Sequence, residues 1–183
     1  MTSPIPAHDA PGAGFEVPLE MLAACHHRVQ RQCTTLQRLV AHLATRDLDE
    51  DARAAATAVM RYFDTSARDH HADEENDLFP ALIESMAGSD ATCIRELIDS
   101  LKADHRCIET QWRCLRSKLA RIAAGEAQTL LAGDVHPLIA SYERHIAREE
   151  AELLPMAARL LSDTALESVG RAMRERRGVV MPS

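Results

Sequence analysis

Apolar residues recur at alternating steps of four and three positions along two long stretches of the chain. This spacing keeps side chains on one face of an α-helix. In the first stretch, from Leu19 to about Thr45, the inward positions are Leu22, His26, Val29, Cys33, Leu36, Val40 and Leu43. In the second, which ends near Ala124, they are Leu101, His105, Ile108, Trp112, Leu115 and Leu119. One histidine interrupts each apolar stripe, so we expect both imidazoles to face the interior of the fold.

Two further helices are predicted, from about Glu50 to Met86 and from near Asp134 to Leu161. Asp49 is well placed to cap the first of them. Pro80 is expected to bend that helix in its last third, and Pro137 falls in the first turn of the other. The segments that separate the helices are residues 46–49, 87–90 and 125–133.

The ends of the chain differ from this central part. Residues 1–18 contain four prolines and two glycines, which predicts an arm instead of a packed element. Residues 162–178 read as a shorter helix, capped by Ser162 or Asp163. The sequence therefore predicts an all-α fold. Residues 19–161 are expected to form an up-and-down four-helix bundle, and the C-terminal helix is expected to pack against its side.

The composition agrees with a helical protein and argues against one class of partner, nucleic acid. Only 3% of the 183 residues are aromatic, while 46% are hydrophobic. The core must therefore be built mainly from Leu, Ala, Val, Met and Cys. The net charge of −7 and the lack of a basic stripe argue against nucleic acid as a partner. No apolar run is long enough for a membrane span and no signal segment opens the chain, so a cytoplasmic location is expected.

The cysteines are expected to be reduced thiols that pack as small hydrophobic residues. Their number is odd, and no two are arranged as CxxC. They are Cys25, Cys33, Cys93, Cys107 and Cys114.

One motif occurs twice. The segments HHADEENDLFP (70–80) and HIAREEAELLP (145–155) both read HxxxEExxL[F/L]P. The stretches around His26 and His105 also match each other, more weakly. The chain thus reads as two helical hairpins related by a pseudo-twofold axis. The residues that coincide in the strong motif are His70/His145, Glu74/Glu149, Glu75/Glu150, Leu78/Leu153 and Pro80/Pro155.

The second copy decides which histidine of the first copy faces inward. In the first copy either His70 or His71 can do so, each with a glutamate four positions later. The second copy has only His145, followed by Glu149 after four positions. By equivalence the inward groups are His70, Glu74, His145 and Glu149. The groups expected to face outward, or to lie behind the inward ones, are His71, Glu75 and Glu150.

The interior would then receive one histidine from each of four helices and one carboxylate from each of two. A buried carboxylate is costly without a charge partner or a metal, and neutral imidazoles supply no charge. The alternative is a set of His–Glu ion pairs that face solvent. Six nitrogen and oxygen donors are too many for one tetrahedral zinc, and they suit two first-row ions such as iron or manganese. The predicted metal ligands are His26, His70, Glu74, His105, His145 and Glu149.

The order of these ligands resembles the hemerythrin-like (HHE cation-binding) family, over about residues 19–161. Ferritin-like bundles instead carry Glu three positions before His. The resemblance implies two iron ions inside a four-helix bundle, with Glu74 and Glu149 bridging them and the four histidines as terminal ligands. Proteins of this family bind O2 reversibly, or react with O2, NO or peroxide at an open iron position.

The chain also departs from the oxygen-carrying members. These carry a second histidine four positions after the first on the third helix, where this chain has Glu109. Their last helix has a five-residue step that would select Glu150 instead of Glu149. The resemblance then implies an iron position that is open to water or filled by Glu109. The four-His, two-Glu set is more similar to bacterial members linked to nitric-oxide and oxidative stress. Tyr142 reads either as a hydrogen-bond donor to a bound oxygen species or as a core residue.

Three functions are compatible with these residues. The first is a di-iron protein that binds or senses O2 or NO. The second is an oxidoreductase that turns over peroxide or NO at the same site, which requires a low-molecular-weight reductant. The third is an interaction module in which a metal only holds the helices together. Six ligands exceed what a structural zinc needs, which favours the first two, and the sequence indicates no particular protein partner.

Overall fold

The computed structural model of the chain describes residues 14–86 and 92–179. These residues form helices and connecting turns, with no β-strand among them, so the predicted all-helical fold is confirmed. The α-helices are α1 (Pro18–Thr45), α2 (Glu50–Asp64), α3 (Ser66–Asp73), α4 (Phe79–Ser85), α5 (Thr92–Ala123), α6 (Ala132–Arg148), α7 (Leu154–Leu160) and α8 (Asp163–Arg176). Two π-helical turns are η1 (Glu74–Leu78) and η2 (Glu149–Leu153).

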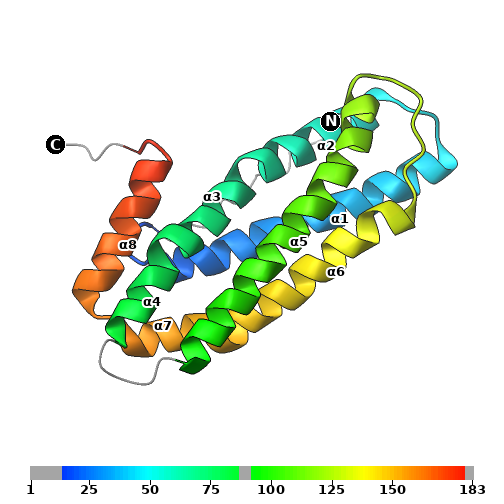
Figure 1. The fold of residues 1–183 in the computed structure, drawn as a ribbon. Helices are drawn as coiled ribbons and strands as arrows, with labels where there is room; N and C mark the ends of the chain where they lie inside the picture. The colour runs from blue at the N-terminus through cyan, green and yellow to red at the C-terminus, as the bar shows by residue number, and fades with distance from the viewer. Residues whose placement is uncertain (1–13, 87–91, 180–183) are drawn as a thin grey trace, which may run out of the picture.

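The helices join into rods that lie side by side (Figure 1). α1 and α5 are each one long helix, whereas α2, α3, η1 and α4 follow one another in a second rod, and α6, η2 and α7 in another. Contacts run in a circle, from α1 to α2, α2 to α5, α5 to α6 and α6 back to α1. α8 contacts α1 and α3. Among the described residues, no helix is both long and apolar enough to cross a membrane.

Local signals explain where several helices begin and end. The Asp49 carboxylate accepts a hydrogen bond from the N–H of Ala52 at 2.9 Å, which confirms the predicted cap of α2. Of the two candidate caps for α8, Ser162 is the one used, with its hydroxyl accepting from the N–H of Ala165. Gly125 has a φ of +79° just after α5, a conformation that glycine adopts at little cost.

The helix predicted from Glu50 to Met86, with a bend at Pro80, is interrupted twice. At Thr65 the backbone leaves the helical region (φ −124°, ψ −82°), and its hydroxyl donates to the carbonyl of Arg61 at 2.7 Å. Such a bond from side chain to backbone competes with the regular helix ladder. The second interruption is η1, which ends at Leu78, two residues before Pro80. The helix predicted from Asp134 to Leu161 is interrupted in the same way by η2.

A polar layer divides the apolar core into two clusters. On every rod the inward histidine or glutamate lies between apolar residues of one cluster and those of the other. On α5, for example, Leu101 belongs to one cluster and Ile108 to the other, with His105 between them. Apolar side chains therefore close the polar layer on both sides.

The segment before α1 packs against α8. The guanidinium groups of Arg174 and Arg177 lie 5.7 and 5.9 Å from the ring centroid of Phe15. Pro18, expected in the arm, is the first residue of α1 and is buried. Most of the predicted arm, residues 1–13, lies outside the described residues, as does the predicted break at 87–90.

All five cysteines are free thiols. Cys25 and Cys33 are buried on α1, as expected of small hydrophobic residues. For Cys93, Cys107 and Cys114 that expectation is wrong: they are exposed, because they lie off the inward stripe of α5.

Candidate metal centre

The inward side chains predicted from the sequence come together in the polar layer. His26, His70, Glu74, His105, His145 and Glu149 are each at most 4% exposed. They come from α1, α3, η1, α5, α6 and η2, so residues from all four rods meet at one place. The alternative of solvent-facing His–Glu pairs does not describe this arrangement.

The donor atoms form two sets that share both carboxylates. Within each set, one donor atom per residue lies within 4.8 Å of the others. One set consists of His26, His70, Glu74 and Glu149, and the other of His105, His145, Glu74 and Glu149. Each set offers two imidazoles and two carboxylates, so two cations can be accommodated next to each other with both carboxylates within reach.

Each carboxylate lies between an imidazole of its own rod and one of a neighbouring rod. The oxygens of Glu74 are 3.4 Å from Nε2 of His70 and 3.2 Å from Nε2 of His105. In the second copy, the oxygens of Glu149 are 3.1 Å from Nε2 of His145 and 3.0 Å from Nε2 of His26.

These close contacts are not aligned as hydrogen bonds. Both oxygens of Glu74, both oxygens of Glu149 and Nε2 of His26 are buried and have no hydrogen-bond partner in the described part of the chain. Buried polar atoms are nearly always satisfied in native proteins, so a cluster of unsatisfied acceptors requires an explanation. Lone pairs that converge on a common space are the arrangement a cation requires. The residues present therefore fit a metal.

A second pair of carboxylates holds two of the histidines from behind. Glu75 lies 2.7 Å from Nδ1 of His105, and Glu150 lies 3.1 Å from Nδ1 of His26. A carboxylate at Nδ1 fixes the proton there and leaves Nε2 free as a ligand. Glu75 and Glu150 were expected either to face outward or to lie behind the inward groups. Both carboxylates contact an inward histidine from behind. Glu150 does not replace Glu149 among the converging donors.

The electrostatics of the buried pair also favour a cation. Burial raises the pKa of Glu74 well above its ordinary value, and the charge of Glu149 adds to this effect. Burial acts on Glu149 in the same direction, but the imidazoles of His145 and His26 outweigh it and hold its pKa well below the ordinary value. Burial lowers the pKa of His70 to about 3, so this imidazole is neutral and ready to act as a ligand. A bound cation would supply the positive charge that allows both carboxylates to ionise.

The π-helical turns place the motif residues in the core. Four consecutive inward positions in each copy are spaced by four, and all eight residues are at most 1% exposed. In a regular α-helix each step of four drifts by about 40°. The wider turn absorbs this drift: the N–H of Phe79 donates to the carbonyl of Glu74, and that of Leu154 to Glu149, five residues earlier. The inward positions are His70, Glu74, Leu78 and Leu82, and His145, Glu149, Leu153 and Ala157.

Comparison with known proteins agrees with this site. The family model of the hemerythrin HHE cation-binding domain matches residues 17–157. This chain belongs to that family. A protein of Haemophilus influenzae, described as an "Uncharacterized protein", is 31% identical over 167 residues, which cover 91% of this chain and 94% of its own length. The matched region of the HHE domain contains all six converging residues.

A buried acidic residue that sequence analysis missed adjoins the site. Asp73, directly before Glu74 in the HHE domain, is fully buried. It forms ion pairs with Arg176 and with Arg177, the latter at 2.5 Å, at the C-terminal end of α8. Arg176 also binds Asp77 at 2.7 Å. α8 therefore anchors the segment that carries Glu74. The adjacent arginines in the segment ERRG (175–178) were the one sequence feature that could have suggested a buried acidic partner.

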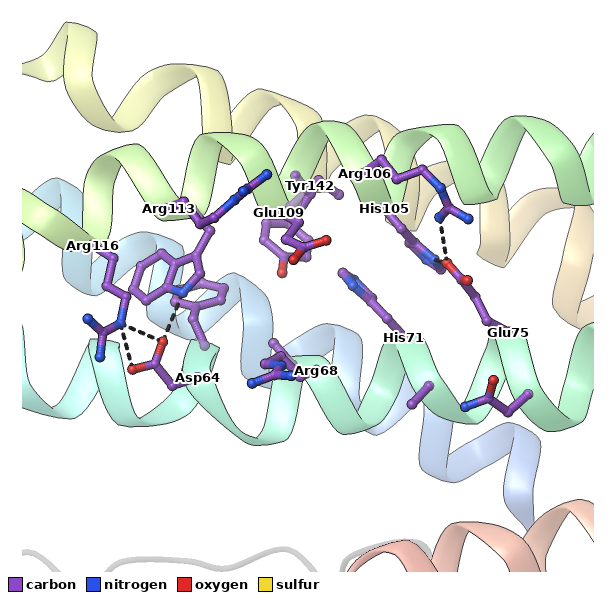
Figure 2. Close-up of a pocket in the computed structure, with 16 residues that line it drawn as sticks. Asp64, Arg68, His71, Glu75, His105, Arg106, Glu109, Arg113, Arg116 and Tyr142 are labelled. Carbon is purple, nitrogen blue, oxygen red and sulfur yellow. Dashed lines mark hydrogen bonds and ion pairs between the residues drawn. The ribbon is translucent and has the colours of Figure 1, made fainter.

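A cleft leads from the surface to the second set of ligands. It has a volume of about 670 Å3 and lies between the α2–α3 rod and α5 (Figure 2). His71 and His105 extend into it from the two sides, and Tyr142 and Glu109 also line it. Tyr142 is 3% exposed and belongs to the core cluster. Glu109 is exposed and is not part of the converging donor sets.

Proposed function

We propose that this chain is a non-heme di-iron protein that binds or senses O2 or NO at an open iron position. The site would lie in the core of a hemerythrin-like up-and-down four-helix bundle, with α8 added to its side. One observation carries the proposal: two donor sets, each with two histidines, share two buried carboxylates. A structural zinc needs four ligands and no shared pair.

Each group has a defined role in the proposal. His26 and His70 would hold one iron, His105 and His145 the other, and the two shared carboxylates both. Iron bound in this donor set supplies one-electron redox chemistry and an open position for a small ligand. The protein orients two imidazoles through Glu75 and Glu150. The apolar clusters on either side of the polar layer limit the access of water.

The cleft favours a second candidate function. Its volume of about 670 Å3 is in the range of small-molecule sites and far exceeds what a diatomic gas needs. An oxidoreductase that consumes peroxide or NO requires a reductant, and a low-molecular-weight reductant could approach His105 through this cleft. Gas binding without added reductant would favour the first function. Catalytic loss of peroxide or NO with a reductant would favour the second.

The proposal extends to partners and location. The ligand would be a small gas or peroxide, with no nucleic acid or membrane as a partner, and the protein would act in the cytoplasm. None of the geometry above requires a protein partner.

Metal analysis and an optical spectrum test the proposal. The protein is produced in iron-supplemented cells and measured as isolated, after reduction, and after exposure to air and to NO. We expect about two irons per chain and near-ultraviolet bands that disappear on reduction and respond to the gases. The same measurements on Glu149→Ala should show loss of iron, with Glu152→Ala as the control, since Glu152 is exposed and its one ion pair within the described residues is with Arg148, at 3.5 Å. One zinc per chain without a response to gas would contradict the proposal.

A further inference from the structure

We propose that His71 is a third histidine ligand of the metal held by His105 and His145, so that the two metal positions have different ligands. This inference rests on the metal centre proposed above and assigns to it a residue that the sequence pattern placed outside. Its basis is the proximity of His71 and His105, which line the cleft, to His145.

The three imidazoles are close enough to bind one ion. One ring nitrogen of each of His71, His105 and His145 lies within 4.8 Å of the others. The centroid of the His71 ring lies 4.0 Å from that of His105 and 5.9 Å from that of His145. The His71 and His105 rings are stacked, with planes at 14°, so His71 would turn its ring to direct a nitrogen at an ion shared with His105. Figure 2 shows His71 extending from α3 into the space between the two rods, beside His105 of α5.

His71 also has a buried nitrogen without a partner. Its Nε2 is buried and forms no hydrogen bond within the described residues. Two histidines elsewhere in the chain are satisfied: His27 lies 3.4 Å from Gln30 and His42 lies 2.9 Å from Asp49. A solvated surface histidine would not need to leave a buried nitrogen unpaired, because water would satisfy it. The free nitrogen of His71 is therefore a donor that lacks its cation.

The internal repeat shows that this ligand is present on one side only. The repeat that relates His70 to His145 relates His71 to Ile146. Ile146 is apolar and 3% exposed, so it offers no donor to the metal at the equivalent position. The metal held by His105 and His145 would then have three histidines, and the one held by His26 and His70 would have two.

The difference in ligand number determines where a small ligand binds. If both carboxylates are shared, one metal would have five protein donors and the other four. The position with fewer donors, next to His26 and His70, would be the open one. His71 thus fills the coordination that Glu109, exposed on the cleft, does not provide.

Titration of the metal-free chain with Co2+ tests the assignment, because the visible bands of Co2+ report its coordination number. Wild type should bind two ions with distinct spectra. His71→Ala should bind one ion at least ~10-fold more weakly, a loss at the lower end of that measured for residues that support metal ligands. The spectrum of that ion should change and that of the other should not. His27→Ala, which removes an exposed histidine, should behave as wild type.

Chemical rescue separates loss of a ligand from damage to the fold. His71 borders a cleft of about 670 Å3, so added imidazole can reach the vacated place. Imidazole should restore the spectrum and affinity of the weakened ion in His71→Ala, and 1,3-dimethylimidazolium, which has no free nitrogen, should not. Thermal unfolding of the metal-free variants, followed by circular dichroism, verifies that they fold.

A measurement on the wild-type protein does not depend on any variant. In the NMR spectrum of the chain with two Co2+ bound, each ligand imidazole contributes a strongly shifted, exchangeable N–H signal. Five such signals support the assignment, and four contradict it. Unchanged Co2+ binding in His71→Ala would also overturn it while leaving the metal centre intact. Failure of wild type to bind Co2+ or iron would overturn both proposals.

Discussion

Oε2 of Glu149 lies 3.0 Å from Nε2 of His26, and both side chains are fully buried. The contact joins η2 in the last long rod to α1 in the first. Glu74 forms the equivalent contact with His105, at 3.2 Å, between the two middle rods. Each motif therefore places its carboxylate next to a histidine of one of the two long uninterrupted helices, α1 or α5. These two matching contacts agree with the pseudo-twofold axis inferred from the repeat.

The two adjacent glutamates of the second motif should differ in their effect on metal binding. Glu149→Ala removes a shared donor and should abolish binding of both ions. Glu150→Gln removes only the carboxylate behind His26, so it should weaken binding by ~10- to 100-fold. Competition with a chromogenic chelator measures both effects. Equal losses in the two variants would contradict the different roles assigned to them.

Removing the metal should destabilise the fold. Binding to the folded state alone contributes about 2.7 kcal/mol when the free metal exceeds its Kd 100-fold. Chelation should therefore lower the Tm of the wild-type protein, as measured by calorimetry. It should not change the Tm of Glu149→Ala, which has no bound metal to lose. A wild-type Tm that does not depend on chelator would mean that the site is empty in solution.

The ion pairs that anchor α8 should contribute strongly to stability. The double variant Arg176→Ala/Arg177→Ala leaves Asp73 buried and without a charge partner. A buried charge that loses its partner typically costs about 3–5 kcal/mol. Urea unfolding of the metal-free protein measures the loss. Arg171→Ala, on the exposed side of α8, serves as the control and should change stability by less than about 0.5 kcal/mol.

Gly170 should not tolerate a side chain. A Cβ at this position would lie 2.1 Å from the carbonyl oxygen of Phe15, which is backbone and cannot rotate away. Gly170→Ala should therefore push the segment before α1 off α8 and cost about 1–3 kcal/mol, as overpacking does. Gly133→Ala is the matched control, because a Cβ there would meet no described atom within 4 Å apart from its chain neighbours and its own helix backbone. Thermal unfolding of the two variants compares them directly, and equal stability would refute the contact.

Thiol alkylation should distinguish buried from exposed cysteines. Burial raises the pKa of Cys33 to about 12 and also raises that of Cys25. Only the thiolate reacts, so both remain protonated and unreactive at pH 8. Iodoacetamide should add to Cys93, Cys107 and Cys114 in the native protein. Mass spectrometry should find the other two modified only after denaturation, and rapid native labelling of Cys33 would contradict the fold.

Several features could be predicted from the sequence because their cause is local. The inward faces of α1 and α5 follow from the spacing of apolar residues, and His26 and His105 are buried where that spacing places them. The cap at Asp49 depends on residues that are close in sequence. The comparison of two copies identified the buried histidine of the first motif, which one copy alone left open.

Other features escaped prediction although a signal was present. The inward residues of both motifs are spaced by four in succession, which a regular helix cannot keep on one face, and the π-helical turns resolve this conflict. The helix predicted from Glu50 to Met86 was expected to bend at Pro80, whereas it departs from regular α-helical geometry about one turn earlier, in η1. Proline follows the wide turn in both copies, at a position where its missing N–H is tolerated.

The sequence by itself determined that the six converging donors face inward, because helical periodicity is set by residues a few positions apart. It also indicated their chemistry, because nitrogen and oxygen donors at those positions fit a metal. Only the tertiary structure decided which donors share a set, that His71 faces the cleft, and that Asp73 meets Arg176 and Arg177. These relationships depend on which rods are neighbours and on how they are rotated against each other. That arrangement results from packing between segments far apart in the chain, which no local pattern encodes.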